Sequence, residues 1–205
     1  MDNNKYGRFV AVLSILAFLS FPIHAQADEG PHHSNVACPA GLVNGLTLDE
    51  EFGPGASAIT HCVKVRHHLR VAVEINRKCR NVLDTSSGCT SGGPAALGNM
   101  VNMIKDYEIT SGMKQGRDYE MIAIVHGAGG LLLLKGNPFE GKIQDLMSQG
   151  VKFYFCQNTA RGFISKGLLP QGDATAYLIE GVEYVTAGFT ALADKQQQGW
   201  SVVTP

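Results

Sequence analysis

The residue best suited to chemistry in this sequence is Cys156, which ends an apolar, β-rich run and precedes a segment typical of a helix. The run is VKFYFC, residues 151–156, and Gln157, Asn158 and Thr159 follow it as residues that begin helices well. A cysteine at a helix start lies beside unpaired backbone N–H groups and the positive end of the helix dipole, and both favour the thiolate. The sequence therefore predicts Cys156 as a nucleophile, although a cysteine at a strand end is also often buried and inert.

A second candidate, His126, ends another apolar run, YEMIAIVH, and is followed by GAGG. The carboxyl ends of parallel strands meet at one edge of a sheet, so we expect His126 and Cys156 on the same edge, where His126 would tune the protonation of the thiol. The glycine turn lacks the spacing of a dinucleotide or phosphate loop, so it indicates an anion cradle only weakly. The predicted anion- or ligand-binding residues are Gly127, Asn158, Thr159 and Arg161.

The five cysteines point to Cys156 as the free thiol, because the other four cluster upstream as Cys38, Cys62, Cys79 and Cys89. A continuous strand over residues 63–75 would hold Cys62 and Cys79 beyond disulfide reach at roughly 3.3 Å per residue. Two connectivities remain open: Cys38–Cys62 with Cys79–Cys89, or Cys38–Cys79 with Cys62–Cys89. The first is preferred because its loops are shorter.

The N-terminal residues 1–27 have the pattern of a secretory signal. Lys5 and Arg8 precede an apolar run that is shorter than the roughly 20 residues needed to cross a bilayer, and Ala25-Gln26-Ala27 offers a cleavage site. We expect a periplasmic or otherwise exported protein with no stable membrane insertion after cleavage. Export also explains how four cysteines would pair in disulfides.

Composition excludes some functions. The formal net charge is −1 and the chain lacks a block of Lys or Arg, so no nucleic-acid partner is expected. His61-Cys62 and His67-His68 lack the spacing of structural zinc ligands, and no metal or cofactor is predicted.

The hydrophobic pattern predicts one α/β domain over residues 63–205 after an irregular, disulfide-tethered extension at 28–62. Residues 63–75 alternate between apolar and polar side chains, which favours a strand at an edge or against another subunit. Apolar periodicity and runs then predict alternating helices and strands; the helices are expected at 95–108, 137–148, after Gln157 and at about 189–197, and the strands at 119–126, 151–156, 182–185 and 200–203. This order predicts a three-layer αβα fold with a doubly wound, mostly parallel five-stranded sheet.

Three segments together resemble the DsrE/DsrF-like family of small sulfur-handling α/β proteins: IAIVHGAGGLLLL, VKFYFCQNTARGFISKGL and VEYVTAGFTALADKQQQGWSVV. The resemblance covers roughly residues 63–204 and implies the DsrE/F-like fold. By this resemblance, Cys156 matches the family's sulfur-carrying cysteine and His126 matches a His-Gly pair after the second strand. The resemblance also implies an oligomer: a homotrimer or homohexamer, or a related hetero-oligomer, of which the homo-oligomer is preferred. The signal sequence and four extra cysteines depart from the cytosolic pattern.

The leading hypothesis is therefore a periplasmic sulfur carrier, similar to a sulfurtransferase, that holds a persulfide on Cys156. Its partners would be sulfur donor and acceptor proteins or small sulfur species, and whether it turns over as an enzyme stays open. Two alternatives remain: a protein that binds a small anion or ligand without chemistry, and an oligomeric adaptor that acts through a polar face at Arg66, His68 and Arg70.

Overall fold

A computed structural model describes residues 45–60, 68–81, 84, 86, 88–90 and 93–205 of the chain. Its main feature is a five-stranded parallel sheet in the order β6-β5-β4-β1-β7. The strands are β1 (Leu69–Ile75), β4 (Tyr119–Val125), β5 (Lys152–Cys156), β6 (Glu183–Val185) and β7 (Ser201–Val203). The predicted doubly wound α/β fold is confirmed.

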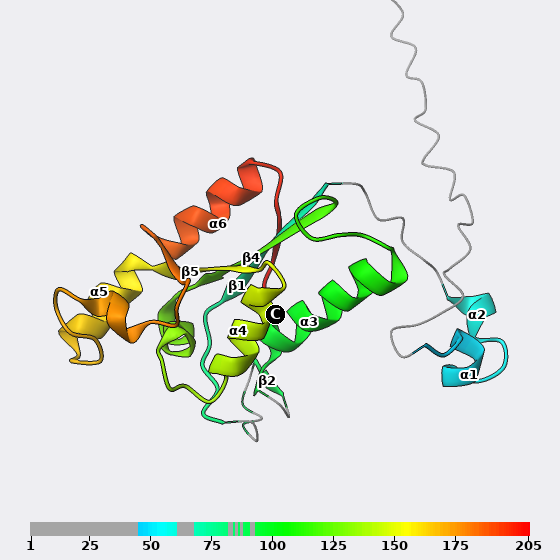
Figure 1. Cartoon of the computed structure of the whole chain (residues 1–205), viewed down its shortest axis with the longest axis horizontal. Helices are drawn as coiled ribbons and strands as arrows, with labels where there is room; N and C mark the ends of the chain where they lie inside the picture. The colour runs from blue at the N-terminus through cyan, green and yellow to red at the C-terminus, as the bar shows by residue number, and fades with distance from the viewer. Residues whose placement is uncertain (1–44, 61–67, 82–83, 85, 87, 91–92) are drawn as a thin grey trace, which may run out of the picture. The chain divides into compact units, whose positions relative to one another are not determined.

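Helices cover both faces of this sheet (Figure 1). The larger core lies between the sheet and α3 (Ala95–Lys105), α4 (Glu140–Ser148) and α5 (Gln157–Ser165), with Leu97, Ile143 and Phe163 among its buried side chains. On the opposite face, α6 (Gly188–Gln197) contributes Leu192 to a smaller core with Trp200. The helices therefore form the two outer layers that the alternating pattern predicts.

Strand β1 lies between β4 and β7, so its predicted place at an edge is wrong. Its alternation reflects two differently lined faces rather than exposure. Val71 and Val73 enter the larger core, whereas the polar side chains on the other face find partners in neighbouring elements. Arg70 donates from Nη2 to the carbonyl of Gln198, 2.6 Å away, and Glu74 is only 9% exposed within a group of hydrogen-bonded side chains. A satisfied polar residue can occupy a central strand, which periodicity alone does not reveal.

Most predicted element boundaries agree with the structure to within a few residues. The helix expected at 95–108 ends at Lys105 and continues as a π-helical turn, η1 (Asp106–Thr110). The apolar segment after His126 is a 3-10 helix, η2 (Gly127–Leu133), and a second short one is η3 (Ala174–Tyr177). Residues 61–67, which include the start of the predicted first strand, lie outside the described residues.

Part of the predicted irregular extension forms two short helices, α1 (Leu48–Phe52) and α2 (Ala56–Ile59). Thr47 and Glu50 form a capping box at the start of α1, a local signal that the sequence interpretation missed. Asp49 then accepts hydrogen bonds from the backbone N–H and the hydroxyl of Ser57. Neither helix buries a side chain, so polar contacts define this segment.

A small antiparallel ribbon of β2 (Cys89–Thr90) and β3 (Gly93–Pro94) precedes α3. Cys89 at its start is joined to Cys79 by a disulfide, which confirms that half of the preferred pairing. Cys38 and Cys62 lie outside the described residues, so their pairing stays a prediction. Among the cysteines that the structure describes, Cys156 is the unpaired one.

Candidate functional site

Cys156 is the last residue of β5 and the N-cap of α5, as the sequence predicts. Its side chain is buried, with 4% of its surface exposed. The backbone N–H of Gly188, the first residue of α6, donates to Sγ over 3.2 Å. The sulfur therefore lies where two helices begin, one following β5 and the other following β6.

N–H donors from both helices act on the charge of this sulfur. Burial raises the pKa of Cys156, but the backbone N–H groups of Thr159 and Gly188 lower it, as do the Thr159 hydroxyl and the N–H of Asn158. The net pKa lies below the ordinary value for cysteine, because hydrogen bonds to a thiolate favour the charged form. The favourable placement at the start of α5 was predicted, whereas the donor from α6 was not.

His126 directly follows β4 and lies beside Cys156 along the sheet edge. Val125 pairs with Phe155 in the parallel register, so His126 and Cys156 are next to each other in that register. The imidazole is buried, and its Nε2 lies 2.8 Å from Oε1 of Glu74 in β1. Among the hydrogen bonds of the described residues, the ring bonds to this carboxylate and none joins it to the sulfur of Cys156.

Gly188 connects His126 with Cys156. A Cβ added at Gly188 would lie 2.9 Å from Cβ of His126 and 3.0 Å from two ring carbons, so only glycine fits this contact without movement. The next residue, Phe189, places its ring centroid 4.6 Å from that of His126 while 72% of its surface stays exposed. Sequence reasoning missed Gly188, although a glycine at the first position of a helix after a strand is a signal for close packing.

The GAGG turn is a packing element. A Cβ at Gly129 would lie 2.5 Å from the carbonyl oxygen of Ile75, and one at Gly130 would lie 2.6 Å from the ring of Phe155. The N–H of Gly127, a predicted anion ligand, donates to the hydroxyl of Thr159 over 2.8 Å. This bond ties the turn after β4 to the first turn of α5, beside the sulfur.

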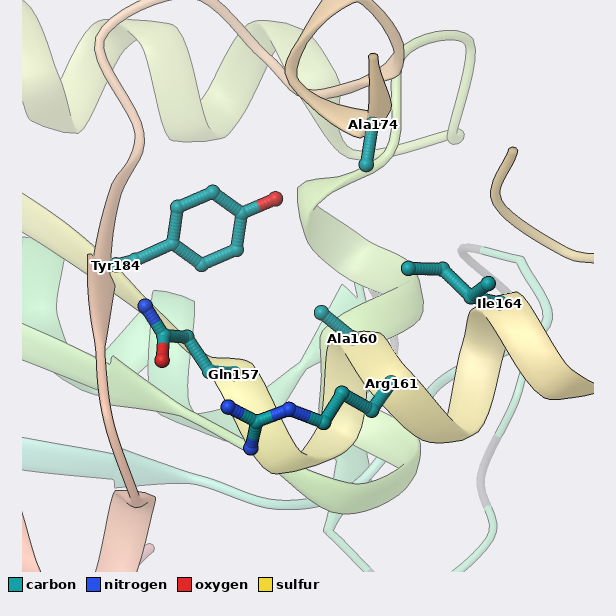
Figure 2. Close-up of a pocket in the computed structure, with 6 residues that line it drawn as sticks. All are labelled: Gln157, Ala160, Arg161, Ile164, Ala174 and Tyr184. Carbon is teal, nitrogen blue, oxygen red and sulfur yellow. The ribbon is translucent and has the colours of Figure 1, made fainter. Parts of the chain in front are cut away.

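Arg161 and Asn158 lie one turn apart on α5, and Nη1 of Arg161 donates to Oδ1 of Asn158 over 2.6 Å. Arg161 also lines an open pocket of about 290 Å³ between α5, η3 and β6. Figure 2 shows its six lining residues: Gln157, Ala160, Arg161, Ile164, Ala174 and Tyr184. The polar ends of Gln157, Arg161 and Tyr184 face this space, whereas Cys156 is not among the residues that line it.

Within the part of the chain that the structure describes, no three His, Cys, Asp or Glu side chains gather closely enough to hold a metal ion. The described helices are all too short or too polar to cross a bilayer.

The sequence profile of the DsrE/DsrF-like family matches residues 96–205, which include His126, Cys156 and Gly188. This match spans more than half of the chain, and the protein belongs to the DsrE/DsrF-like family. The resemblance stated from the sequence is thus confirmed, and membership associates the chain with sulfur-related function. Glu74 precedes the matched region.

Among solved structures, the chain is similar to a protein of unknown function, MTH1491, from Methanobacterium thermoautotrophicum. The two are 23% identical with a TM-score of 0.47, and the match covers 67% of this chain and 99% of the other. None of the curated proteins matches this chain.

Proposed function

We propose that this protein is a periplasmic sulfur carrier that holds a persulfide on Cys156. The observation that supports this most directly is an unpaired sulfur that faces N–H donors from the starts of α5 and α6. Those donors favour the thiolate, which is the attacking form of cysteine. Family membership adds the association with sulfur chemistry.

The proposed reaction is thiol exchange at a sulfane sulfur. The Cys156 thiolate attacks the outer sulfur of a donor R–S–S⁻, a bond forms between Sγ and that sulfur, and the donor S–S bond breaks. R–S⁻ leaves with the bonding electron pair, so the products are Cys156–S–S⁻ and a thiolate, and no external oxidant is needed. Thiosulfate would react in the same way and release sulfite. An acceptor thiolate then removes the sulfur by the reverse exchange.

The residues around Cys156 have distinct roles in this proposal. The backbone N–H groups of Asn158 and Thr159 stabilise negative charge on sulfur, and His126 tunes the environment of the thiol from the adjacent strand end. Arg161, one turn into α5, attracts anionic donors such as thiosulfate.

Access to the sulfur requires a local movement, because Cys156 is 4% exposed. The N-terminal turn of α6 covers it through Gly188, and the exposed ring of Phe189 extends from the same turn. Displacement of this turn would expose the thiolate to a donor and also make room for a second sulfur atom. We propose that the partners of this protein are sulfur donor and acceptor proteins or small sulfur species. The chain itself would be assembled as a homo-oligomer.

Mass spectrometry of the intact protein after incubation with inorganic polysulfide tests the carrier function. We expect the wild type to gain the mass of sulfur, to lose it again on reduction, and to have it mapped to the peptide that contains Cys156. The matched control, Cys156→Ser, should gain none. Equal gain by both proteins, or no gain by the wild type, would refute a carrier role for Cys156.

The burial of Cys156 and the separate pocket beside Arg161 favour a second candidate, binding of a small anion without covalent chemistry. Calorimetric titration with thiosulfate, followed by mass spectrometry of the titrated protein, separates the two functions. Simple binding predicts an affinity that Cys156→Ser leaves unchanged and Arg161→Gln reduces. A carrier predicts that Cys156→Ser abolishes the covalent product whatever the affinity.

A further inference from the structure

Glu74 lies in the centre of the sheet, in β1, and it was not anticipated as a functional residue. Its side chain is 9% exposed, and a buried carboxylate is costly unless hydrogen bonds replace its water. Here Oε1 accepts from Nδ2 of Asn76 over 3.0 Å and from the His126 ring over 2.8 Å, while Oε2 accepts from the hydroxyl of Thr204 over 2.8 Å. Both oxygens are therefore engaged.

These partners keep the carboxylate ionised. Burial raises the pKa of Glu74, but the hydrogen bonds from Thr204 and His126, the charge interaction with His126 and the bond from Asn76 together lower it below its ordinary value. An ionised carboxylate only accepts hydrogen bonds. The Nε2 atom of His126 must therefore carry a proton, which fixes both the tautomer and the direction of the ring.

A continuous set of contacts leads from this ring to the sulfur. His126 packs against Gly188 so closely that a Cβ there would lie 2.9 Å from Cβ of the histidine and 3.0 Å from its ring carbons Cγ and Cδ2, and the tilted ring of Phe189 lies against the same imidazole. Gly188 in turn donates its N–H to Sγ of Cys156 over 3.2 Å. Rotation of the imidazole would move these two ring carbons away from Gly188 and so loosen the contact that holds its N–H in place for this hydrogen bond.

We propose that Glu74 is a positioning residue for Cys156: it fixes the imidazole of His126, which holds the Gly188 N–H against the sulfur. This role deepens the proposed function, since it concerns the thiolate that would carry sulfur. It also goes beyond the family match, which begins at residue 96.

The protonation state of His126 in the wild-type protein provides the first test, by ¹⁵N NMR of the histidine ring. We expect the neutral ring to carry its proton on Nε2 and to have an unprotonated Nδ1. A neutral ring protonated on Nδ1 would overturn the proposal, and this result requires no variant to fold.

The second test is the midpoint of the rate–pH profile for alkylation of Cys156 by iodoacetamide, followed on its own peptide. The midpoint reports thiolate formation, whereas changes in access alter the plateau. Glu74→Gln keeps every hydrogen bond, since Gln accepts at Oε1 and donates to Thr204, and it removes only the negative charge. Its midpoint should stay the same or fall, because an anion near the thiolate has been removed.

Glu74→Ala removes the charge and also releases His126. If Glu74 positions His126, the alkylation midpoint should then rise instead of fall. Loss of the Gly188 hydrogen bond should raise the midpoint by about one pH unit, a roughly tenfold loss of thiolate at neutral pH. The control Thr204→Val removes one bond to Glu74 but leaves His126 held, so its midpoint should move less. A midpoint that falls in Glu74→Ala as in Glu74→Gln, or that rises equally in Thr204→Val, would overturn the proposal.

These outcomes are separate from those for the carrier function. Alkylation follows the thiolate whether or not the protein accepts sulfur. Glu74 could thus control Cys156 in a protein that forms no persulfide, and a persulfide could form in a protein whose alkylation ignores Glu74.

Discussion

Two cysteine regions of this molecule lie at or after the carboxyl ends of strands in the same parallel sheet, with β4 between those strands, and they differ in what surrounds the sulfur. Cys79 follows β1 and is bonded to Cys89; their sulfurs lie 3.9 Å from the carbonyl oxygen of Gly88 and 3.5 Å from that of Lys78. Cys156 ends β5, and its sulfur faces the N–H of Gly188 and those of α5. The bridged pair adjoins two backbone carbonyl acceptors and one side-chain donor, the Ser86 hydroxyl at 3.6 Å from Sγ of Cys89, whereas the backbone groups around the free sulfur are donors.

This difference explains why the Cys79–Cys89 region is a structural disulfide and the Cys156 region is a candidate reactive site. Carbonyl oxygens destabilise a neighbouring thiolate, so reduced Cys79 and Cys89 would gain little as free anions there. The N–H groups around Cys156 favour the anion. The direction of the backbone dipoles at a strand end therefore separates two sulfurs of the same chemical type.

The largest effect that sharpens this comparison is loss of the disulfide. The double variant Cys79→Ala, Cys89→Ala should lower the free energy of unfolding by about 2–3 kcal/mol, because the bridge closes a short loop. Chemical denaturation measures this loss. The rate–pH midpoint of Cys156 should stay unchanged in the same variant; a shift of that midpoint would show that the two regions are coupled.

A smaller effect is expected from Gly188→Ala. This variant tests the region around Cys156, where the N–H of Gly188 donates to the sulfur. The new Cβ would press on His126 at 2.9 Å, so the start of α6 must move. We expect a loss of about 1–3 kcal/mol in stability from overpacking, together with a higher midpoint for Cys156 alkylation. Thermal unfolding and the alkylation profile measure the two changes.

The matched control for this variant is Gly162→Ala in α5, where an added Cβ meets no atom within 4 Å. It should be neutral or slightly stabilising, since alanine favours helix over glycine. If Gly162→Ala and Gly188→Ala shift the midpoint of Cys156 alike, the Gly188 hydrogen bond is not what favours the thiolate.

The sequence predicted the two site residues at strand ends, Cys156 and His126. It missed Glu74 and Gly188, which reach the site through contacts distant in sequence. Cys156 and His126 could be placed because each ends an apolar run, and parallel strands end at a common edge. Glu74 and Gly188 are 52 and 32 residues from the partners they contact, and their contacts depend on the strand order. That order places β1 beside β4, which a pattern of alternating polar residues cannot show.

The same reasoning applies to the fold. Periodicity gave the alternation of helices and strands, and the positions of most elements followed from it. The error at β1 arose because the alternation of polar side chains in residues 63–75 was taken to favour an edge strand, whereas Asn76, His126 and Thr204 replace the water around Glu74. Burial of a charge through distant partners leaves no local sequence signal.

The smallest expected effect is a pH dependence of stability that belongs to Cys156 alone. Its pKa in the folded state is lowered from the ordinary value of 9.0, so between the folded and unfolded pKa values the unfolded chain binds more protons. The thiolate's contribution to stability is therefore complete above the unfolded pKa and is lost as pH falls through the folded pKa. Denaturation of wild type and Cys156→Ser from neutral to alkaline pH, with oxygen excluded, measures this contribution as the difference between their free energies of unfolding.

This difference should shift in favour of the wild type as pH rises toward 9.0. A difference that stays constant, or shifts toward the serine variant, would mean that donors at the two helix starts do not favour the anion. Cys156 would then be a packed sulfur like those of the disulfide, and the contrast between the two regions would disappear.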